Sequence, residues 1–472
     1  MVAFPEIEKS EVTRHSVVIG NQTVEYKATA GTLHLPGEEG DDAASIFYVA
    51  YEREGIRDKS KRPVMFTFNG GPGSSSVWLH MGTFGPRRVA MNDAVHPQPP
   101  PYNLVDNAYS LLDVTDLVFI DPVGTGYSHA LGEAEDKDFH GIEEDVQAVG
   151  DFIRLWVTRK QRWNSPKLVG GESYGTTRTA ALASHLQQRG IFPNGLVLVS
   201  SILNFQTARF LPGNDLPFIL FLPTYAATAW YHGRIENPPP DIEAFLGPVR
   251  EFALGPYASA LMQGDQLGDE EKAAIVKQLS AFTGLSSEYL HQTNLRINIR
   301  RFVKELLRDE RRTVGRLDSR FKGMDMDAAG ENYEHDPSMT AIMGPYTAAV
   351  NHYLRSELGY EDDKEYEILS GTVSRNWNWD VESQRTGYIN VAENMRQAMA
   401  KDRYLKVFVA NGYYDIATPF FATEYTMDHL QVEPELKGNI EMHYYESGHM
   451  MYIHEPSLIK LKEDLGAFIE GL

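Results

Sequence analysis

The chain has 472 residues, of which 42% are hydrophobic and 23% are charged, a balance that favours a folded, soluble protein over a disordered one. Its formal net charge of −21 argues against binding to nucleic acid or to anionic membrane surfaces, because phosphate groups would repel it. It contains no cysteine, which excludes thiol catalysis, disulfides and zinc–thiolate sites.

The compartment stays open at this stage. No apolar run approaches the roughly 20 residues that span a bilayer. The start of the chain, Met1–Glu6, lacks the basic and then apolar pattern of a signal peptide. A secreted or periplasmic location remains possible if a signal was removed, and nothing indicates the oligomeric state.

The first predicted elements are strands. Residues 15–28 form apolar runs around a Gly20-Asn21 turn, typical of a hairpin, and Ser45–Tyr51 is a further strand candidate. From Val64 onward, short apolar runs alternate with helical stretches. These runs are 64–68, 117–120, 167–169, 196–199, 405–409 and 440–445. The alternation predicts an α/β fold with a mostly parallel central sheet covered on both faces.

The alternation stops between about residues 206 and 340. Charged, helix-favouring segments such as Asp269–Thr283 and Asn298–Arg312 occur here without strand-like runs. We therefore expect a helical cap inserted at 206–340 into a core formed by residues 1–205 and 341–472.

A candidate nucleophile lies in Gly171-Glu172-Ser173-Tyr174-Gly175, which matches Gly-x-Ser-x-Gly. The chemistry needs a hydroxyl exposed on a sharp strand-to-helix turn, and a short strand precedes Ser173 while an Ala- and Leu-rich helix, 176–188, follows it. The alternative is a Gly-rich turn with an idle serine, since the motif alone also occurs by chance.

A glycine-rich loop, Asn69–Ser76, directly follows the strand at 64–68. Acyl transfer needs backbone N–H groups aimed at the developing oxyanion, and glycine lets the backbone approach it closely. We expect the amides of Gly71 and Tyr174 to form this oxyanion hole. A phosphate-binding loop is disfavoured because the Lys-Ser/Thr ending is absent, whereas an ordinary tight turn remains an alternative.

Asp415 and His449 each follow a predicted strand near the C-terminus, giving the order Ser–Asp–His that is expected of α/β-hydrolases. His449 would take the proton of Ser173, and Asp415 would orient the imidazole. His443, His449 and His454 could suggest a metal site, but their irregular spacing argues against one. No metal or organic cofactor is predicted.

Four segments together resemble the serine carboxypeptidase family. They are the Asn-Gly-Gly-Pro-Gly loop that begins at Asn69, the segment Asp121–Ser128, the motif around Ser173, and Gly448-His449-Met450. The resemblance covers most of the chain, in the family's order. It implies an α/β-hydrolase fold and removal of single residues from peptide C-termini.

The resemblance also implies how the terminal carboxylate would be bound. Asn69 and Glu172 match the family's Asn and one of its two Glu residues, and Gly70 and Met450 lie in the matching segments. The second Glu is replaced by Thr83. Two carboxyl groups bind a carboxylate by sharing protons, which favours acidic conditions, so this replacement is expected to alter recognition of a free C-terminus.

Three functions therefore stay open. The leading one is a serine carboxypeptidase that acts on peptides through an acyl-enzyme on Ser173. The second is a carboxylesterase or acyltransferase that uses the same triad on small esters. The third is a non-catalytic binding protein on the hydrolase fold.

Overall fold

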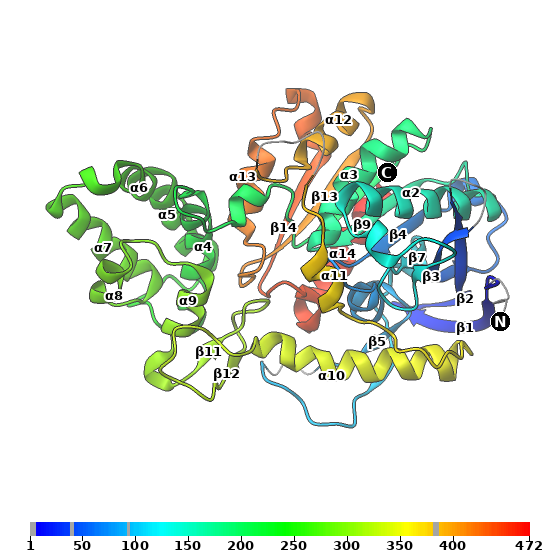
Figure 1. The fold of residues 1–472 in the computed structure, drawn as a ribbon, viewed down its shortest axis with the longest axis horizontal. Coiled ribbons are helices and arrows are strands. Elements are labelled where there is room, and N and C mark those ends of the chain that lie inside the picture. The colour runs from blue at the N-terminus through cyan, green and yellow to red at the C-terminus, as the bar shows by residue number, and fades with distance from the viewer. Residues whose placement is uncertain (1–5, 38–41, 92–94, 381–386) are drawn as a thin grey trace.

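The computed structural model describes residues 6–37, 42–91, 95–380 and 387–472, so residues 1–5, on which the expectation about the chain start rests, lie outside it. One large sheet with the strand order β1-β2-β3-β7-β4-β9-β10-β13-β14 organises the fold, and β8 pairs with β3 (Figure 1). Its strands are β1 Ser10–Ile19, β2 Gln22–Pro36, β3 Asp42–Arg53, β4 Val64–Phe68, β7 Asp116–Ile120, β8 His129–Ala130, β9 Lys167–Glu172, β10 Gly195–Val199, β13 Lys406–Gly412 and β14 Ile440–Tyr445.

The sheet is parallel from β7 to β14 and antiparallel from β1 to β3. Every run predicted as a strand is a strand, and the hairpin predicted around Gly20-Asn21 is confirmed. β4, β7, β9 and β10 are buried along their whole length, as expected for parallel strands covered on both faces. The predicted mostly parallel α/β sheet is therefore confirmed.

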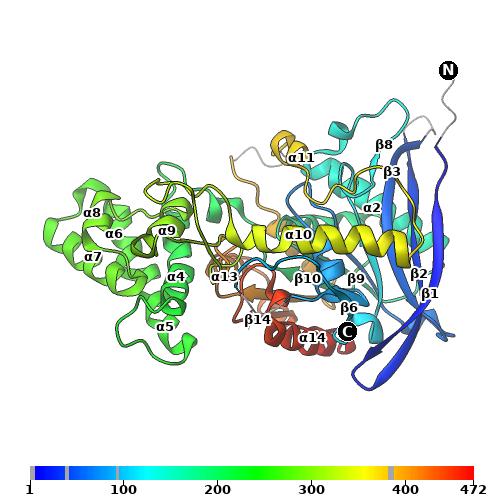
Figure 2. The same ribbon diagram turned by 90° about the horizontal axis from the view of Figure 1, so that it is seen from below.

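Helices cover both faces of the sheet (Figures 1 and 2). On one face, α2, α3 and α12 share a hydrophobic core with the strands, and on the other α10 and α14 do so. Their bounds are α2 Ile142–Arg159, α3 Tyr174–Gln188, α10 Pro337–His352, α12 Ala392–Lys401 and α14 Glu455–Glu470. None of the helices in the described ranges is long and apolar enough to cross a bilayer.

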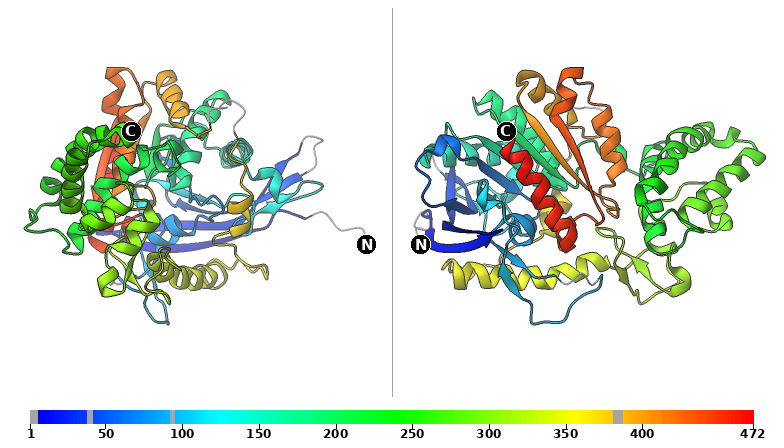
Figure 3. Two further views of the ribbon diagram at one scale, coloured as in Figure 1. Left: turned by 60° about the vertical axis from the view of Figure 1, so that its left-hand side comes forward. Right: turned by 180° about the vertical axis from the view of Figure 1, so that it is seen from behind.

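The predicted insertion forms a mostly helical body whose hydrophobic core also includes residues of the segments 413–416 and 420–422. It lies to one side of the sheet, beyond β14 and next to α13, Phe420–Asp428 (Figure 3). Its helices are α4 Leu216–Tyr231, α5 Ile242–Phe252, α6 Ala258–Gln263, α7 Asp269–Thr283, α8 Ser287–Gln292 and α9 Ile299–Glu305.

One expectation for the insertion is wrong in detail. It contains a short antiparallel pair, β11 Thr313–Val314 with β12 Lys322–Gly323, although no strand was predicted there. Two-residue strands are too short to produce an alternating pattern in the sequence. The expected boundary at residue 340 falls inside α10, and the division into core and cap stays a prediction.

Smaller elements complete the fold around the glycine-rich loop and below the sheet. They are β5 Arg87–Val89 paired with β6 Leu104–Asp106, and the short helices α1 Val77–Leu79 and α11 Gly371–Asn376. Because the parallel strands β4, β9, β10, β13 and β14 are neighbours, the loops that follow them meet at one edge of the sheet.

Candidate active site

Ser173 occupies a sharp turn between β9 and α3. Its φ of 60° and ψ of −130° are unusual for a residue with a side chain, as expected where a nucleophile is forced out of a strand-to-helix turn. Its N–H donates to the carbonyl of Val199 at 3.0 Å. A Cβ at Gly171 would lie only 2.2 Å from the Gly175 carbonyl, so the turn closes tightly only with glycine there. The motif thus forms the predicted strand-to-helix turn, which we call the elbow.

Asp415 and His449 are joined directly. The Nδ1 atom of His449 lies 2.7 Å from Oδ2 of Asp415, and both side chains are buried. Asp415 also accepts hydrogen bonds from the N–H groups of Ala417 (2.8 Å) and Thr418 (3.0 Å). A carboxylate held in this way keeps the imidazole proton on Nδ1 and leaves Nε2 free to act as a base.

The environment of His449 favours its protonated form. Burial alone would lower the pKa of the imidazole, but the charge and hydrogen bond of Asp415 and the charge of Glu172 outweigh it and raise the pKa above the usual value. The raised pKa makes the imidazole a stronger base for a serine proton.

Ser200 lies between the predicted nucleophile and the predicted base. Its Oγ donates to the carbonyl of His449 at 2.7 Å, while the preceding residue, Val199, accepts the N–H of Ser173. No hydrogen bond joins Ser173 Oγ to His449 within the described residues. The structure therefore brings both loops to the same edge, and catalytic hydrogen bonds of this kind often tighten only with substrate.

The glycine-rich loop packs onto the start of α3. A Cβ at Gly70 would lie 2.4 Å from the N atom of Tyr174 and 2.8 Å from the carbonyl of Glu172, so only glycine allows this approach. The N–H of Gly71 has no acceptor in the described part of the chain, and Tyr174 begins α3, where N–H groups lack intrahelical partners. Two amide donors thus stand next to the Ser173 turn.

A buried ion pair fixes this loop to the elbow helix. Arg178 donates to Asp145 at 2.6 Å and to the carbonyl of Asn69 at 2.8 Å. Its guanidinium also lies over the rings of Phe68 and Tyr174. Sequence reasoning missed Arg178 and Asp145, since no local pattern relates residues of different helices to the loop.

Glu172, the residue before Ser173, is buried among polar side chains. Tyr452 donates a hydrogen bond of 2.6 Å to its Oε2. Burial raises the pKa of Glu172 to about 7, against the lowering effects of the charge on His449 and of the Tyr452 and Asn69 side chains. Asn69 accepts the N–H of Leu79 at 3.1 Å, whereas its Nδ2 lacks a partner of regular geometry among the described residues. The Asn69 amide therefore lies beside a carboxyl group whose pKa is about 7.

The segment of Thr83 packs against Tyr452, the hydrogen-bond partner of Glu172. Thr83 is buried, and the preceding Gly82 lies so close to the Tyr452 ring that a Cβ there would be 2.3 Å from Cε2. Met450, in contrast, is buried in the hydrophobic core on the α10 and α14 side of the sheet. Sequence reasoning missed Tyr452, although its position three residues after His449 indicates that it lies near the predicted site.

A segment of the predicted insertion, residues 316–320, contacts both the loop that carries Asp415 and the loop that carries His449; we call this segment the strap. The N–H of Ile416, next to Asp415, donates to the carbonyl of Arg316 at 3.1 Å. The N–H of His449 donates to the carbonyl of Leu317 at 2.7 Å. The strap therefore holds Ile416, which is the residue after Asp415, and it also holds His449 itself.

Side chains of the strap add further contacts with the loop that carries His449. Asp318 accepts the N–H of Gly448 at 3.1 Å and forms a buried ion pair of 2.6 Å with Arg320. Arg320 also donates to Ser447 Oγ at 2.8 Å and to the carbonyl of Glu446 at 3.1 Å. No sequence signal predicted the strap, because its contacts are with residues about 100 or more positions away.

Comparison with known proteins shows which family the chain belongs to. A family model with the description "Serine carboxypeptidase" matches residues 20–455. The chain belongs to the serine carboxypeptidase family. Among curated members, Serine carboxypeptidase-like 49 of Arabidopsis thaliana is 29% identical over 191 residues, covering 39% of this chain and 33% of the relative. A pheromone-processing carboxypeptidase of Cryptococcus gattii is 28% identical over 249 residues, covering 52% and 33%.

The chain spans about a third of the length of the curated family members it matches. A solved member, a prohormone-processing carboxypeptidase of Saccharomyces cerevisiae, superposes with a TM-score of 0.58 at 16% identity, covering 94% of this chain and 91% of that one. This likeness supports the α/β-hydrolase fold.

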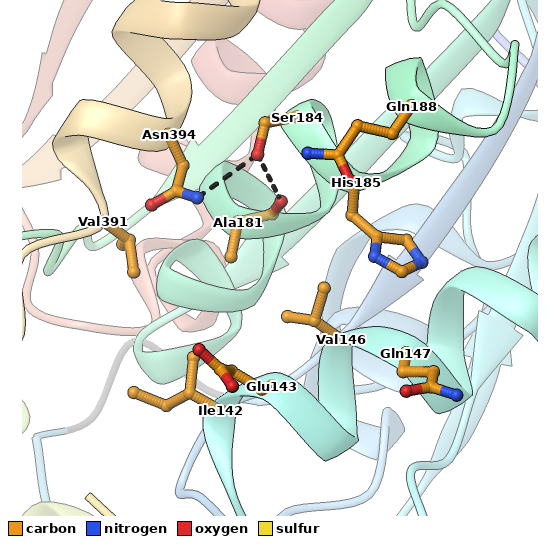
Figure 4. A pocket seen from close by; sticks show the side chains of 10 residues that line it. All are labelled: Ile142, Glu143, Val146, Gln147, Ala181, Ser184, His185, Gln188, Val391 and Asn394. Carbon is orange, nitrogen blue, oxygen red and sulfur yellow. Dashed lines mark hydrogen bonds between the residues drawn. The ribbon is translucent and has the colours of Figure 1, made fainter. Parts of the chain in front are cut away.

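A surface hollow between α2, α3 and α12 lies apart from Ser173, Asp415 and His449 in this member of the family (Figure 4). Its lining includes Ala181 and Ser184, about two helical turns or more along α3 from Ser173. Asn394 donates to Ser184, which donates to the Ala181 carbonyl, so these polar groups are already paired. Within the described ranges, no group of three or more His, Cys, Asp or Glu side chains is placed to hold a metal ion.

Proposed function

We propose that this chain is a serine carboxypeptidase that releases the C-terminal residue of peptides through an acyl-enzyme on Ser173. The observation that carries the proposal is the 2.7 Å hydrogen bond between His449 and Asp415, at the sheet edge where the Ser173 turn also lies. Family membership supports the same activity.

The proposed chemistry follows from the groups at this edge. His449 Nε2 takes the proton as Ser173 Oγ attacks the last peptide carbonyl, and the amides of Gly71 and Tyr174 stabilise the oxyanion. The same proton then passes to the departing amine, which leaves the peptide esterified to Ser173. Water, deprotonated by His449, releases the shortened peptide. Asp415 stabilises the imidazolium in both halves of the reaction.

We propose that the free C-terminus is bound by Asn69 and Glu172. The Nδ2 group of Asn69 can donate to a carboxylate, and Glu172 can do so only in its protonated form. The pKa of about 7 that burial gives Glu172 keeps a large protonated fraction under mildly acidic conditions. Tyr452 replaces a second carboxyl group as the hydrogen-bond partner of Glu172.

Substitution of Ser173 tests the proposal. The Ser173→Ala protein should lose activity on an N-blocked dipeptide by several orders of magnitude while it stays folded. A fluorophosphonate should label the unmodified protein at Ser173. Absence of labelling would favour a non-catalytic binding role, and retained activity in the variant would show that another group attacks.

A second function, ester hydrolysis or acyl transfer, is favoured by Thr83, which stands where the family carries a second Glu. Comparison of kcat/KM on a blocked dipeptide, on its C-terminal amide and on a short-chain ester separates the two functions. A peptidase of the proposed type prefers the free acid. Indifference to the free carboxylate, or product formation only with an added alcohol, would favour the esterase or acyltransferase.

A further inference from the structure

Arg316 is placed between the two triad loops by its backbone. Its carbonyl accepts the N–H of Ile416 at 3.1 Å, and the carbonyl of the next residue, Leu317, accepts the N–H of His449 at 2.7 Å. Its own N–H donates to Asp336 at 3.1 Å. The start of this side chain is therefore held next to both Asp415 and His449.

The charge of Arg316 is uncommitted, in contrast to the other arginine of the strap. Arg316 is half-buried, and its guanidinium has no hydrogen bond or ion pair within the described part of the chain. Arg320, four residues away, is saturated by Asp318, Ser447 and the carbonyl of Glu446. A guanidinium whose donors are not used inside the protein can bind an anion that arrives from outside.

The positive charge of Arg316 acts electrostatically on His449. It lowers the pKa of the His449 imidazole, against the raising effects of Asp415 and Glu172. The charged groups that act on the imidazole are thus two carboxyl groups and one guanidinium. Of these, the guanidinium alone attracts an anion.

We propose that Arg316 binds a carboxylate of the departing C-terminal residue and so determines specificity at that position. The inference rests on the proposed carboxypeptidase function. The departing amine receives its proton from His449, so groups attached to that residue come within reach of a side chain anchored beside His449. The carboxylate is either the terminal one, shared with Asn69 and Glu172, or that of an acidic side chain, and the test separates the two.

The test compares Arg316→Gln with the unmodified protein on four substrates. These are a blocked dipeptide ending in Gln, its counterpart ending in Glu, the C-terminal amide of the first, and a neutral short-chain ester. Arg316→Lys keeps the charge but loses the planar fork of donors. Arg300→Gln is the matched control, because Arg300 is an exposed arginine of α9.

We expect Arg316→Gln to lower kcat/KM on the free acids by roughly 10- to 100-fold, mainly through KM, as for the loss of a hydrogen-bonded charge. At the pH optimum of each protein, turnover of the ester and the amide should change by less than about twofold, because loss of the Arg316 charge by itself only moves the pKa of His449 upward. Arg316→Lys should recover part of the loss, and Arg300→Gln should behave as the unmodified protein. Equal losses on the Gln- and Glu-ending acids identify the terminal carboxylate as the ligand, and a loss confined to the Glu-ending acid identifies the side chain.

Two results overturn the inference alone. One is an Arg316→Gln protein that keeps the unmodified kcat/KM on both the Gln-ending and the Glu-ending acid. The other is an equal loss on acid, amide and ester, which indicates that Arg316 only positions the triad loops. If the unmodified protein labels at Ser173 and cleaves the ester without any preference for a free acid, the proposed carboxypeptidase function fails and the inference fails with it.

Discussion

Tyr452 donates a hydrogen bond of 2.6 Å to the carboxyl group of Glu172, so a phenol and a carboxyl group lie together next to Ser173. A phenol cannot ionise there near neutral pH, because burial raises the pKa of Tyr452 far above its usual range. Glu172 is then the group of this pair that titrates near neutral pH, and its protonation state should govern how a substrate carboxylate binds.

The first prediction concerns the pH dependence of binding. Burial raises the pKa of Glu172 to about 7, so below that pH the group is protonated and can donate to a carboxylate. Above it, the ionised group repels the carboxylate. KM for a blocked dipeptide should therefore rise as the pH increases through about 7, whereas KM for a neutral ester should not. Parallel pH profiles for the two substrates, measured by steady-state kinetics, would contradict the role of Glu172.

The second prediction concerns Tyr452→Phe. The hydrogen bond from Tyr452 favours the ionised form of Glu172, so its loss should raise the pKa of Glu172 further. The rise of KM should then move to higher pH by roughly half to one unit, the equivalent of about 1 kcal/mol. Tyr445→Phe is the control, because Tyr445 donates a similar hydrogen bond to Asp464. An unchanged profile in Tyr452→Phe would show that the phenol does not tune Glu172.

The third prediction concerns Asp415→Asn. An amide at this position can stabilise the wrong imidazole tautomer and cannot stabilise the imidazolium, so kcat should fall by about 10⁴-fold while KM changes little. The pKa of His449 should fall as well, because Asp415 raises it. Stopped-flow measurement of acyl-enzyme formation checks the first effect. A loss smaller than about tenfold is incompatible with a triad.

The fourth prediction concerns the contact between the glycine-rich loop and the elbow. In Gly70→Ala, the new methyl group would lie 2.4 Å from the Tyr174 N atom, so one of the two segments must move. We expect kcat to fall by about 100-fold or more, since removing one oxyanion donor has that effect. Gly438→Ala, where a Cβ meets no atom within 4 Å, is the control. Equal activity of both variants would exclude a tight loop contact.

The fifth prediction concerns the strap. Asp318→Asn leaves the buried Arg320 without its counter-charge and should lower the free energy of unfolding by about 3–5 kcal/mol, measured by urea denaturation. The double variant Asp318→Asn with Arg320→Met removes the unpaired charge and should regain part of that stability. If both variants are equally destabilised, the ion pair is not the cause.

Much of the fold could be predicted from the sequence. Apolar runs such as Val64–Phe68 and Leu196–Val199 are legible because a strand buried on both faces requires uninterrupted apolar side chains. The elbow around Ser173 was equally legible, since a tight turn leaves room only for glycine at its flanks. The two-residue strands of the insertion were missed because they carry no periodic signal.

The sequence by itself determined the fold class, the family and the chemical identity of the residues at the sheet edge, because local periodicity and short motifs encode these features directly. The tertiary structure alone decided which groups surround them: Tyr452 at Glu172, Arg178 at Asn69, and the strap at Asp415 and His449. The physical reason is that burial and hydrogen bonding join residues far apart in the chain, and these contacts set the pKa values and the anchoring of the site.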